Sequence, residues 1–151
     1  MSGSLPTKGE VVPSREGVVG AVVPAVAGVV VGAVLSGVYR ALPSRVGRLA
    51  LVQLGSALGA IGAGAAIRSG QPRPAVVEST AAIGYAGVVH AAAHMAPAVL
   101  PLVIAGHGVW DLAQLGRPDA VPPAWWYPAF CAGVDLTLGV LLTVVGRERT
   151  R

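Results

Sequence analysis

Charged residues are scarce in this chain of 151 residues, because Asp, Glu, Lys and Arg together make up only 12% of it. A soluble globular domain carries about 25% charged residues. With half that share there is too little polar surface to cover a globule in water, which excludes an ordinary soluble domain. Aromatic residues are also few, at 5%, so the hydrophobic 54% consists mainly of Ala, Val and Leu. Together with the abundant Gly, these small residues suit closely packed transmembrane helices.

Several chemistries lack the residues they require. The single cysteine, Cys131, excludes an internal disulfide and a CxxC redox or zinc pair. No phosphate-binding Walker loop, no GxGxxG dinucleotide turn and no GxSxG nucleophile motif occurs in the sequence. Nucleotide chemistry and serine-based hydrolysis therefore have no motif to support them.

Long apolar segments make up most of the chain. The first, 17–39, contains no charged residue and is long enough to cross about 30 Å of hydrocarbon. Breaks rich in Pro and Arg separate further segments at 49–67, 75–94, 97–115 and 124–145. We predict an all-α, polytopic transmembrane bundle with five spans, because 75–115 is too long for one span and is interrupted by Pro97 and Pro101; four spans remain possible. A polar tail over 1–16 and a basic tail over 147–151 would flank a single domain over 17–146.

The basic residues lie in the breaks between these segments. The chain has a net charge of +4, which could indicate nucleic acid, but its arginines fall where loop charges orient membrane helices. With five spans, the loop containing Arg40, Arg45 and Arg48 lies on the same side as the C-terminal tail, which would be cytoplasmic. One lysine against ten arginines is typical of a GC-rich bacterial genome. We expect a bacterial plasma membrane protein that contacts membrane lipids and no nucleic acid.

Glycines recur four residues apart at Gly28 and Gly32, and again at Gly55 and Gly59. This spacing puts two small residues on one helix face and predicts close contact between helices of the bundle. A dedicated dimer face is the less favoured interpretation, although an oligomer stays possible.

Three acidic residues, Glu78, Asp111 and Asp135, lie inside apolar segments. Placing an ionisable group at mid-span costs on the order of 2.5–3.5 kcal/mol, so such residues usually face the bundle interior and mark a site. The alternative is a structural role, above all for Glu78, which lies near a helix start where a carboxylate suits the helix dipole.

Polar residues at helical spacing surround these acids. His107, Asp111 and Gln114 share one helix face, and Cys131 and Asp135 repeat the four-residue spacing on the last segment. If the chain alternates direction, these groups could converge on one pocket that opens toward Trp125, Trp126 and Tyr127. The predicted catalytic residues are Asp111, Asp135, Glu78 and His107. The predicted substrate-binding residues are Trp110, Gln114, Cys131, Tyr85 and Trp126.

His90 and His94 form a second pair, four residues apart, near the other end of the third segment. Two histidines at this spacing can bind a metal from one helix face. A histidine near a helix end can also simply meet lipid headgroups. We predict no metal and no cofactor, while ligation of a metal or haem by His90, His94 or His107 stays open.

The pattern His-x-x-Trp-Asp at His107, Trp110 and Asp111, with Cys-x-x-x-Asp at Cys131 and Asp135, resembles a family of small bacterial multi-pass membrane proteins of unknown function. The resemblance covers about residues 70–145, and Glu78 matches a glutamate that opens the middle span. The family has histidines after Trp-Asp where this chain has Ala113 and Gln114. The resemblance implies a shared site and names no reaction.

With the other chemistries excluded, the remaining one is acid–base chemistry by carboxylate and imidazole groups in a site shielded from water. A carboxyl group shielded from water tends to keep its proton at neutral pH and can act as a general acid. The leading hypothesis is a membrane-embedded enzyme acting on an apolar small-molecule or lipid substrate, such as an isoprenoid isomerase or cyclase. The alternatives are a small proton-coupled carrier and a non-catalytic subunit of a membrane complex.

Overall fold

A computed structural model describes residues 15–115, 117 and 119–148 of the protein, with 15–19 and 145–148 as backbone only. All regular elements of this part are helical, which confirms the all-α class. They are α1 (Arg15–Ala41), α2 (Ser44–Arg68), α3 (Pro72–Met95), the short 3₁₀ helix η1 (Pro97–Val99), α4 (Leu100–Gln114) and α5 (Tyr127–Glu148). Most of the two expected tails, 1–16 and 147–151, lies outside the described residues.

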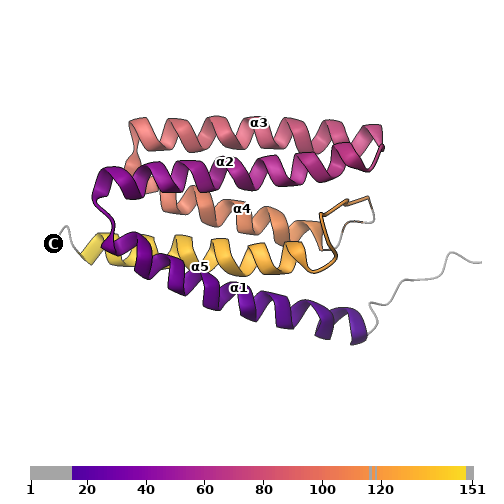
Figure 1. The fold of residues 1–151 in the computed structure, drawn as a ribbon, viewed down its shortest axis with the longest axis horizontal. Coiled ribbons are helices and arrows are strands. Elements are labelled where there is room, and N and C mark those ends of the chain that lie inside the picture. The colour runs from indigo at the N-terminus through magenta and orange to yellow at the C-terminus, as the bar shows by residue number, and fades with distance from the viewer. Residues whose placement is uncertain (1–14, 116, 118, 149–151) are drawn as a thin grey trace, which may run out of the picture.

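The helices run side by side, and each reverses the direction of the one before it (Figure 1). The α2–α3 turn and the α4–α5 connection lie at one end of the bundle, which we call the Gly70 end. The α1–α2 turn and the C-terminal end of α5 lie at the opposite end, which we call the Pro43 end. The first Arg-containing loop and the end of the last helix therefore share one side, as a chain with five helices requires.

Local sequence explains where the helices begin and end. Pro43 precedes α2 in an extended conformation, and Gly70 turns the chain between α2 and α3 at a φ of 70°, which favours glycine. Between α3 and α4 the helix breaks at Ala96 (φ −147°, ψ 67°), directly before Pro97. Helix α2 begins five residues before the predicted 49, because Arg45 and Arg48 extend it beyond its apolar part.

Four of the helices, α1, α2, α3 and α5, are long and apolar enough to cross a membrane. The fifth, α4, has 15 residues and is about 22 Å long at 1.5 Å per residue. It is shorter than the predicted 97–115 because η1 takes the first turn of that segment. Over the described residues the chain is thus a multi-pass helical bundle with five α-helices and four full-length candidate spans.

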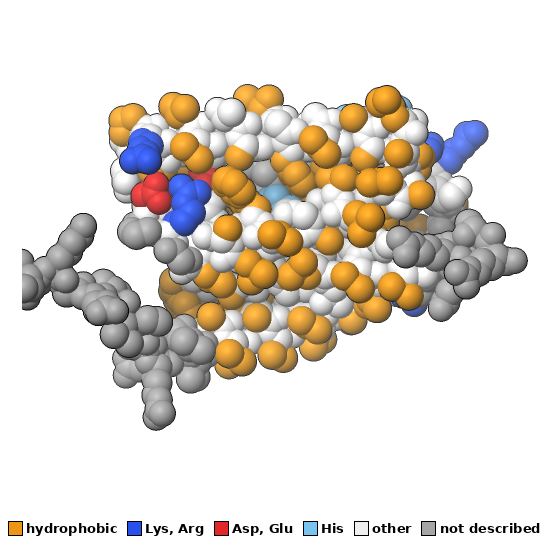
Figure 2. Space-filling view, turned by 180° about the vertical axis from the view of Figure 1, so that it is seen from behind, with side chains coloured by type: hydrophobic (Ala, Val, Ile, Leu, Met, Phe, Trp, Pro, Cys, Tyr) orange, Lys and Arg blue, Asp and Glu red, His pale blue; other side chains and the backbone are white. Residues whose placement is uncertain are grey.

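Large apolar side chains cover the outside of the bundle. Val23 on α1 is 69% exposed and Ile83 on α3 is 76% exposed. Hydrophobic side chains spread along the side of the molecule in Figure 2, whereas Lys and Arg gather near its two ends. Such a surface would be costly in water and is the expected boundary with lipid.

Glycines allow the helices to approach closely. A Cβ atom at Gly32 of α1 would lie 2.6 Å from the Val134 carbonyl oxygen of α5, and one at Gly55 of α2 would lie 2.9 Å from Val89 Cγ2 of α3. Gly28 meets the backbone of α5 at Phe130, and Gly59 faces Ala82 of α3. Contact within the bundle, as predicted from the four-residue spacing, is confirmed.

Two packed units meet in the bundle. Helix α5 packs along both α1 and α4, and α2 packs along α3, while the α2–α3 hairpin contacts α4 much less. Near the Pro43 end this junction is filled by a cluster of buried apolar side chains, which we call the apolar core: Leu51, Val52, Val89, Ala93, Leu100, Ile104 and Leu138. Toward the Gly70 end it holds the polar residues described next.

Candidate functional site

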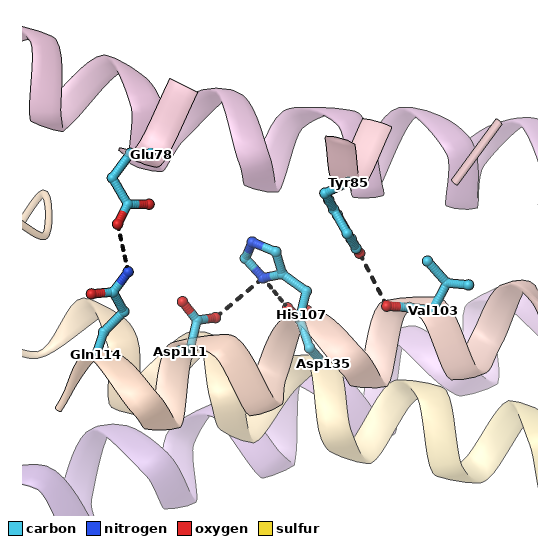
Figure 3. Close-up of polar contacts among 7 residues, drawn as sticks. All are labelled: Glu78, Tyr85, Val103, His107, Asp111, Gln114 and Asp135. Carbon is cyan, nitrogen blue, oxygen red and sulfur yellow. Dashed lines mark hydrogen bonds and ion pairs between the residues drawn. The ribbon is translucent and has the colours of Figure 1, made fainter. Parts of the chain in front are cut away.

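One imidazole lies between two carboxylates inside the bundle. The Nδ1 atom of His107 is 3.0 Å from Oδ2 of Asp135 and 3.3 Å from Oδ2 of Asp111 (Figure 3). Asp135 has no exposed surface, and Asp111 is 6% exposed. We call these three residues the polar cluster. It brings together three of the four predicted catalytic residues.

Helix geometry and one glycine build this cluster. His107 and Asp111 are one turn apart on α4, so their side chains project from the same face. Asp135 lies 28 residues later, on α5, and reaches them because Gly108 has no side chain. A Cβ atom at Gly108 would lie 3.2 Å from the Cβ of Asp135 and the same distance from the Ala132 carbonyl oxygen. A larger residue at 108 would push α5 away from His107.

The two carboxylates together have more acceptors than the imidazole can satisfy. Nδ1 holds one hydrogen at most, and its hydrogen bond goes to Asp135. Oδ2 of Asp111 and Oδ1 of Asp135 are buried without a hydrogen-bond partner. The cluster can therefore accept a further proton or a cation.

An aromatic ring also packs against the imidazole of His107. Tyr85 of α3 packs against His107 with ring centroids 4.9 Å apart and planes tilted by 44°. The Tyr85 hydroxyl donates to the Val103 carbonyl oxygen at 3.4 Å. The second ring nitrogen of His107, Nε2, points away from both carboxylates and toward α3 (Figure 3).

A cavity of about 240 Å³ lies between the α2–α3 hairpin and α4. Its lining includes six of the nine predicted site residues: Glu78, Tyr85, His107, Trp110, Asp111 and Gln114. Asp135 does not line it and lies behind His107. Apolar lining comes from Leu58, Gly59 and Gly62 of α2, and Val121, Pro122 and Pro123 border the cavity toward the Gly70 end.

A second polar contact lies about one turn beyond Asp111 along α4. Nε2 of Gln114 donates to Oε1 of Glu78 at 2.7 Å, which links α4 to α3 across the cavity. The Gln114 Oε1 atom is buried without a hydrogen-bond partner. Glu78 thus contacts Gln114 and stays apart from the three residues of the polar cluster.

An arginine from the α4–α5 connection lies over the Trp110 ring. The Arg117 guanidinium lies 5.9 Å from the Trp110 ring centroid. It also donates to both carboxylate oxygens of Asp119, at 3.3 and 3.2 Å. This hydrogen bonding lowers the pKa of the Asp119 carboxyl from its ordinary value.

Two predicted substrate-binding residues lie away from the cavity lining. Cys131 is buried in α5, and Trp126 is 41% exposed and packs edge-on against Phe130. Tyr127 and the α2 residues do line the cavity, although they are not among the predicted site residues. The four-residue glycine spacing marks Gly59 as a helix contact, but hydropathy does not reveal which helices pair or that this part of α2 borders a cavity.

The polar cluster is also a possible metal site. Its three donor atoms all lie within 4.8 Å of one another, and no other such group of His, Cys, Asp or Glu occurs in the part of the chain that the structure describes. His90 and His94 are exposed on α3, and Nδ1 of His90 is bonded to the Ala86 carbonyl oxygen of its own helix at 2.8 Å. These two histidines are separate from the cluster.

No protein-family profile, curated protein or solved structure matches this chain. The resemblance to a bacterial membrane family thus rests on the sequence pattern alone. Of that pattern, the structure brings together His107, Asp111 and Asp135.

Proposed function

We propose that the protein is an enzyme of the bacterial plasma membrane that moves a proton within a small apolar alkene, as an isoprenoid isomerase or cyclase does. The observation that carries this proposal is the position of His107. Its Nδ1 contacts Asp135 and Asp111 at 3.0 and 3.3 Å, while the ring lines a cavity among apolar helices.

In the proposed resting state, Nδ1 carries the imidazole proton, because an ionised Asp135 can only accept. The lone pair of Nε2 then faces the cavity and makes this nitrogen the general base. Asp135 does not touch the substrate and is a positioning residue. Asp111, which lines the cavity, is the general acid in its protonated form.

The reaction consists of two proton transfers. The O–H bond of Asp111 breaks, and the π electrons of the substrate form a C–H bond with its proton, which leaves a cation on the neighbouring carbon. Nε2 of His107 then removes a proton from an adjacent carbon, and that C–H electron pair forms the shifted double bond. In a cyclase, a second double bond attacks the cation before the proton leaves. Nothing is oxidised or reduced.

The imidazole can also return a proton to the acid. When Nε2 has accepted the substrate proton, the imidazolium holds a second proton on Nδ1. That atom is 3.3 Å from the Asp111 carboxylate, so a proton can pass back to Asp111. This leaves the imidazole as its Nε2–H tautomer. Proton exchange with water from the Gly70 end then returns it to the Nδ1–H tautomer before the next turnover.

The apolar core favours an enzyme over a proton-coupled carrier. A carrier needs access to its site from both membrane faces. Here the seven side chains of the apolar core fill the junction on the Pro43 side of His107. A structural subunit would need the polar cluster only to fix helix register, and this role does not call for an adjoining cavity.

Solvent deuterium tests the proposal. The purified protein would be incubated in D₂O with an apolar extract of its own host membranes, and products would be analysed by mass spectrometry. The wild type should introduce deuterium at carbon into one compound or a pair of isomers. His107→Ala and Asp111→Asn should not, whereas His90→Ala should behave as wild type. Equal incorporation by wild type and His107→Ala, or none by any protein, would contradict the proposal.

A further inference from the structure

The charged groups that line the cavity are unbalanced. Glu78 and Asp111 are in its lining, with Asp135 directly behind His107, and none of the described lining residues is Lys or Arg. Arg117 lies over the Trp110 ring, 5.9 Å from its centroid, and is already paired with Asp119 at 3.2 Å. With Asp111 protonated in the proposed resting state, an anionic ligand would still face the Glu78 carboxylate without a lysine or arginine in the lining to compensate its charge.

Aromatic rings surround the same space. Tyr85, Trp110 and Tyr127 line the cavity, and the tilted Tyr85 ring packs against the imidazole of the polar cluster. The faces of such rings attract a cation, most strongly where water is excluded. The aromatic walls therefore favour a positively charged ligand, as the acidic residues do.

Two side-chain oxygen atoms near the cavity have no hydrogen-bond donor. Gln114 uses its amide N–H on Glu78, and its Oε1 remains buried and unpartnered. Oδ2 of Asp111 also lacks a hydrogen-bond donor. Because residues 111 and 114 are three apart on α4, both acceptors project toward the same side of the helix. Both oxygens are shielded from water and place partial negative charge beside the cavity, which favours a cationic ligand.

We propose that this cavity binds lipophilic organic cations, in particular a protonated amine attached to a small apolar body. The ammonium would lie among Glu78, Asp111 and Gln114, with its hydrocarbon part against Trp110 and the α2 wall. The inference rests on the proposed function in one respect, since such an amine resembles the cation formed during alkene isomerisation. It therefore predicts a class of inhibitors as well as a ligand.

The test compares three probes of equal chain length: N,N-dimethyloctylamine as the cation at pH 7, N,N-dimethyloctanamide as the neutral compound, and octanoate as the anion. Binding to the full-length protein in an uncharged detergent is measured by titration calorimetry. The amine should bind at least about tenfold more tightly than the amide, a ratio that a desolvated cation–π contact can supply. Octanoate should bind most weakly.

Two variants and a matched control assign this preference to the cavity. Glu78→Gln keeps the shape of the side chain and should lose most of the preference for the amine. Gln114→Lys places a cation next to Glu78 and should weaken amine binding to a similar extent. Asp119→Asn removes an acid outside the cavity and should bind the amine like the wild type.

The outcomes separate this inference from the proposed function. Equal binding of amine and amide, or unchanged amine binding in both cavity variants, would overturn the inference, even if deuterium exchange is observed. Selective amine binding that Glu78→Gln abolishes would support it, even if no exchange occurs. In that case the cavity would bind cations without catalysing the proposed reaction.

Discussion

The Nδ1 atom of His107 lies 3.0 Å from Oδ2 of Asp135, although 28 residues separate them in the chain. Because Asp135 does not line the cavity, any effect of this residue on a bound substrate must pass through the imidazole. The pair therefore determines which ring nitrogen carries the proton.

Changing Asp135→Asn should move that proton. An amide can donate to Nδ1, which would place the imidazole proton on Nε2 and remove the base from the cavity. ¹⁵N NMR of histidine side chains should show the change of tautomer at His107, with His90→Ala and His94→Ala used to assign the signals. The turnover number should fall by about 10²–10⁴ with little change in KM. A variant that keeps the original tautomer would contradict the assignment of Asp135 as a positioning residue.

Two glycines of α1 should respond in opposite ways to alanine. A Cβ at Gly32 would lie 2.6 Å from the Val134 carbonyl oxygen, so Gly32→Ala should lower the free energy of unfolding by about 1–3 kcal/mol. Gly37 has no atom within 4 Å of such a Cβ. Gly37→Ala should raise stability by about 0.5–1 kcal/mol through helix propensity. Thermal unfolding in detergent would compare them, and equal effects would argue against close α1–α5 packing.

Zinc should bind the polar cluster and inhibit the proposed reaction. The Nδ1 atom of His107 and the two carboxylates supply three donors within 4.8 Å of one another, a number typical of a zinc site with an open position. Added Zn²⁺ should raise the melting temperature of the wild type, because it binds the folded state. His107→Ala should lose this stabilisation and His94→Ala should keep it. Loss of the effect in His94→Ala alone would locate the ion on the outside of α3.

The direction of the helices predicts which loops share a side. Ser44 and Ser69 lie at opposite ends of the bundle, and each can be replaced by a single reporter cysteine. The native Cys131 is buried, so it should not react with the label. In intact cells, an impermeant maleimide should label the Ser69→Cys variant and leave Ser44→Cys unlabelled, because the Arg-rich Pro43 end should face the cytoplasm. The reverse pattern would invert the orientation, and labelling of both sites would contradict the crossing of α2.

Hydropathy and helix-breaking residues are sufficient to predict which segments are helical, because each long apolar segment ends close to a Pro, Gly or Arg. The grouping of His107 and Asp111 was also predictable, since four-residue spacing on a helix fixes their common face. Asp135 could be expected nearby only because the chain alternates direction. Its contact with Nδ1 depends on Gly108, whose role becomes visible only when α4 and α5 are packed together.

Other features of the site depend on which helices are neighbours, and no local pattern specifies this. Cys131 shares the four-residue spacing with Asp135 but does not line the cavity. Gly59 and Gly62 form a cavity wall because α2 pairs with α3, which apolar segments of similar composition do not reveal. The sequence predicts Glu78 in one pocket with His107 and Asp111, and all three do line one cavity, but the side-chain partner of Glu78 is Gln114.

The apolar core also determines which compartment supplies the protons. Its side chains fill the bundle between the polar cluster and the Pro43 end, so the cluster would exchange protons with the aqueous phase at the Gly70 end. A charge that crosses the whole bilayer gains or loses about 2.3 kcal/mol per 100 mV of membrane potential. Protons that enter and leave on one side make no such crossing. Turnover by the proposed mechanism should therefore neither consume the transmembrane voltage nor depend on it.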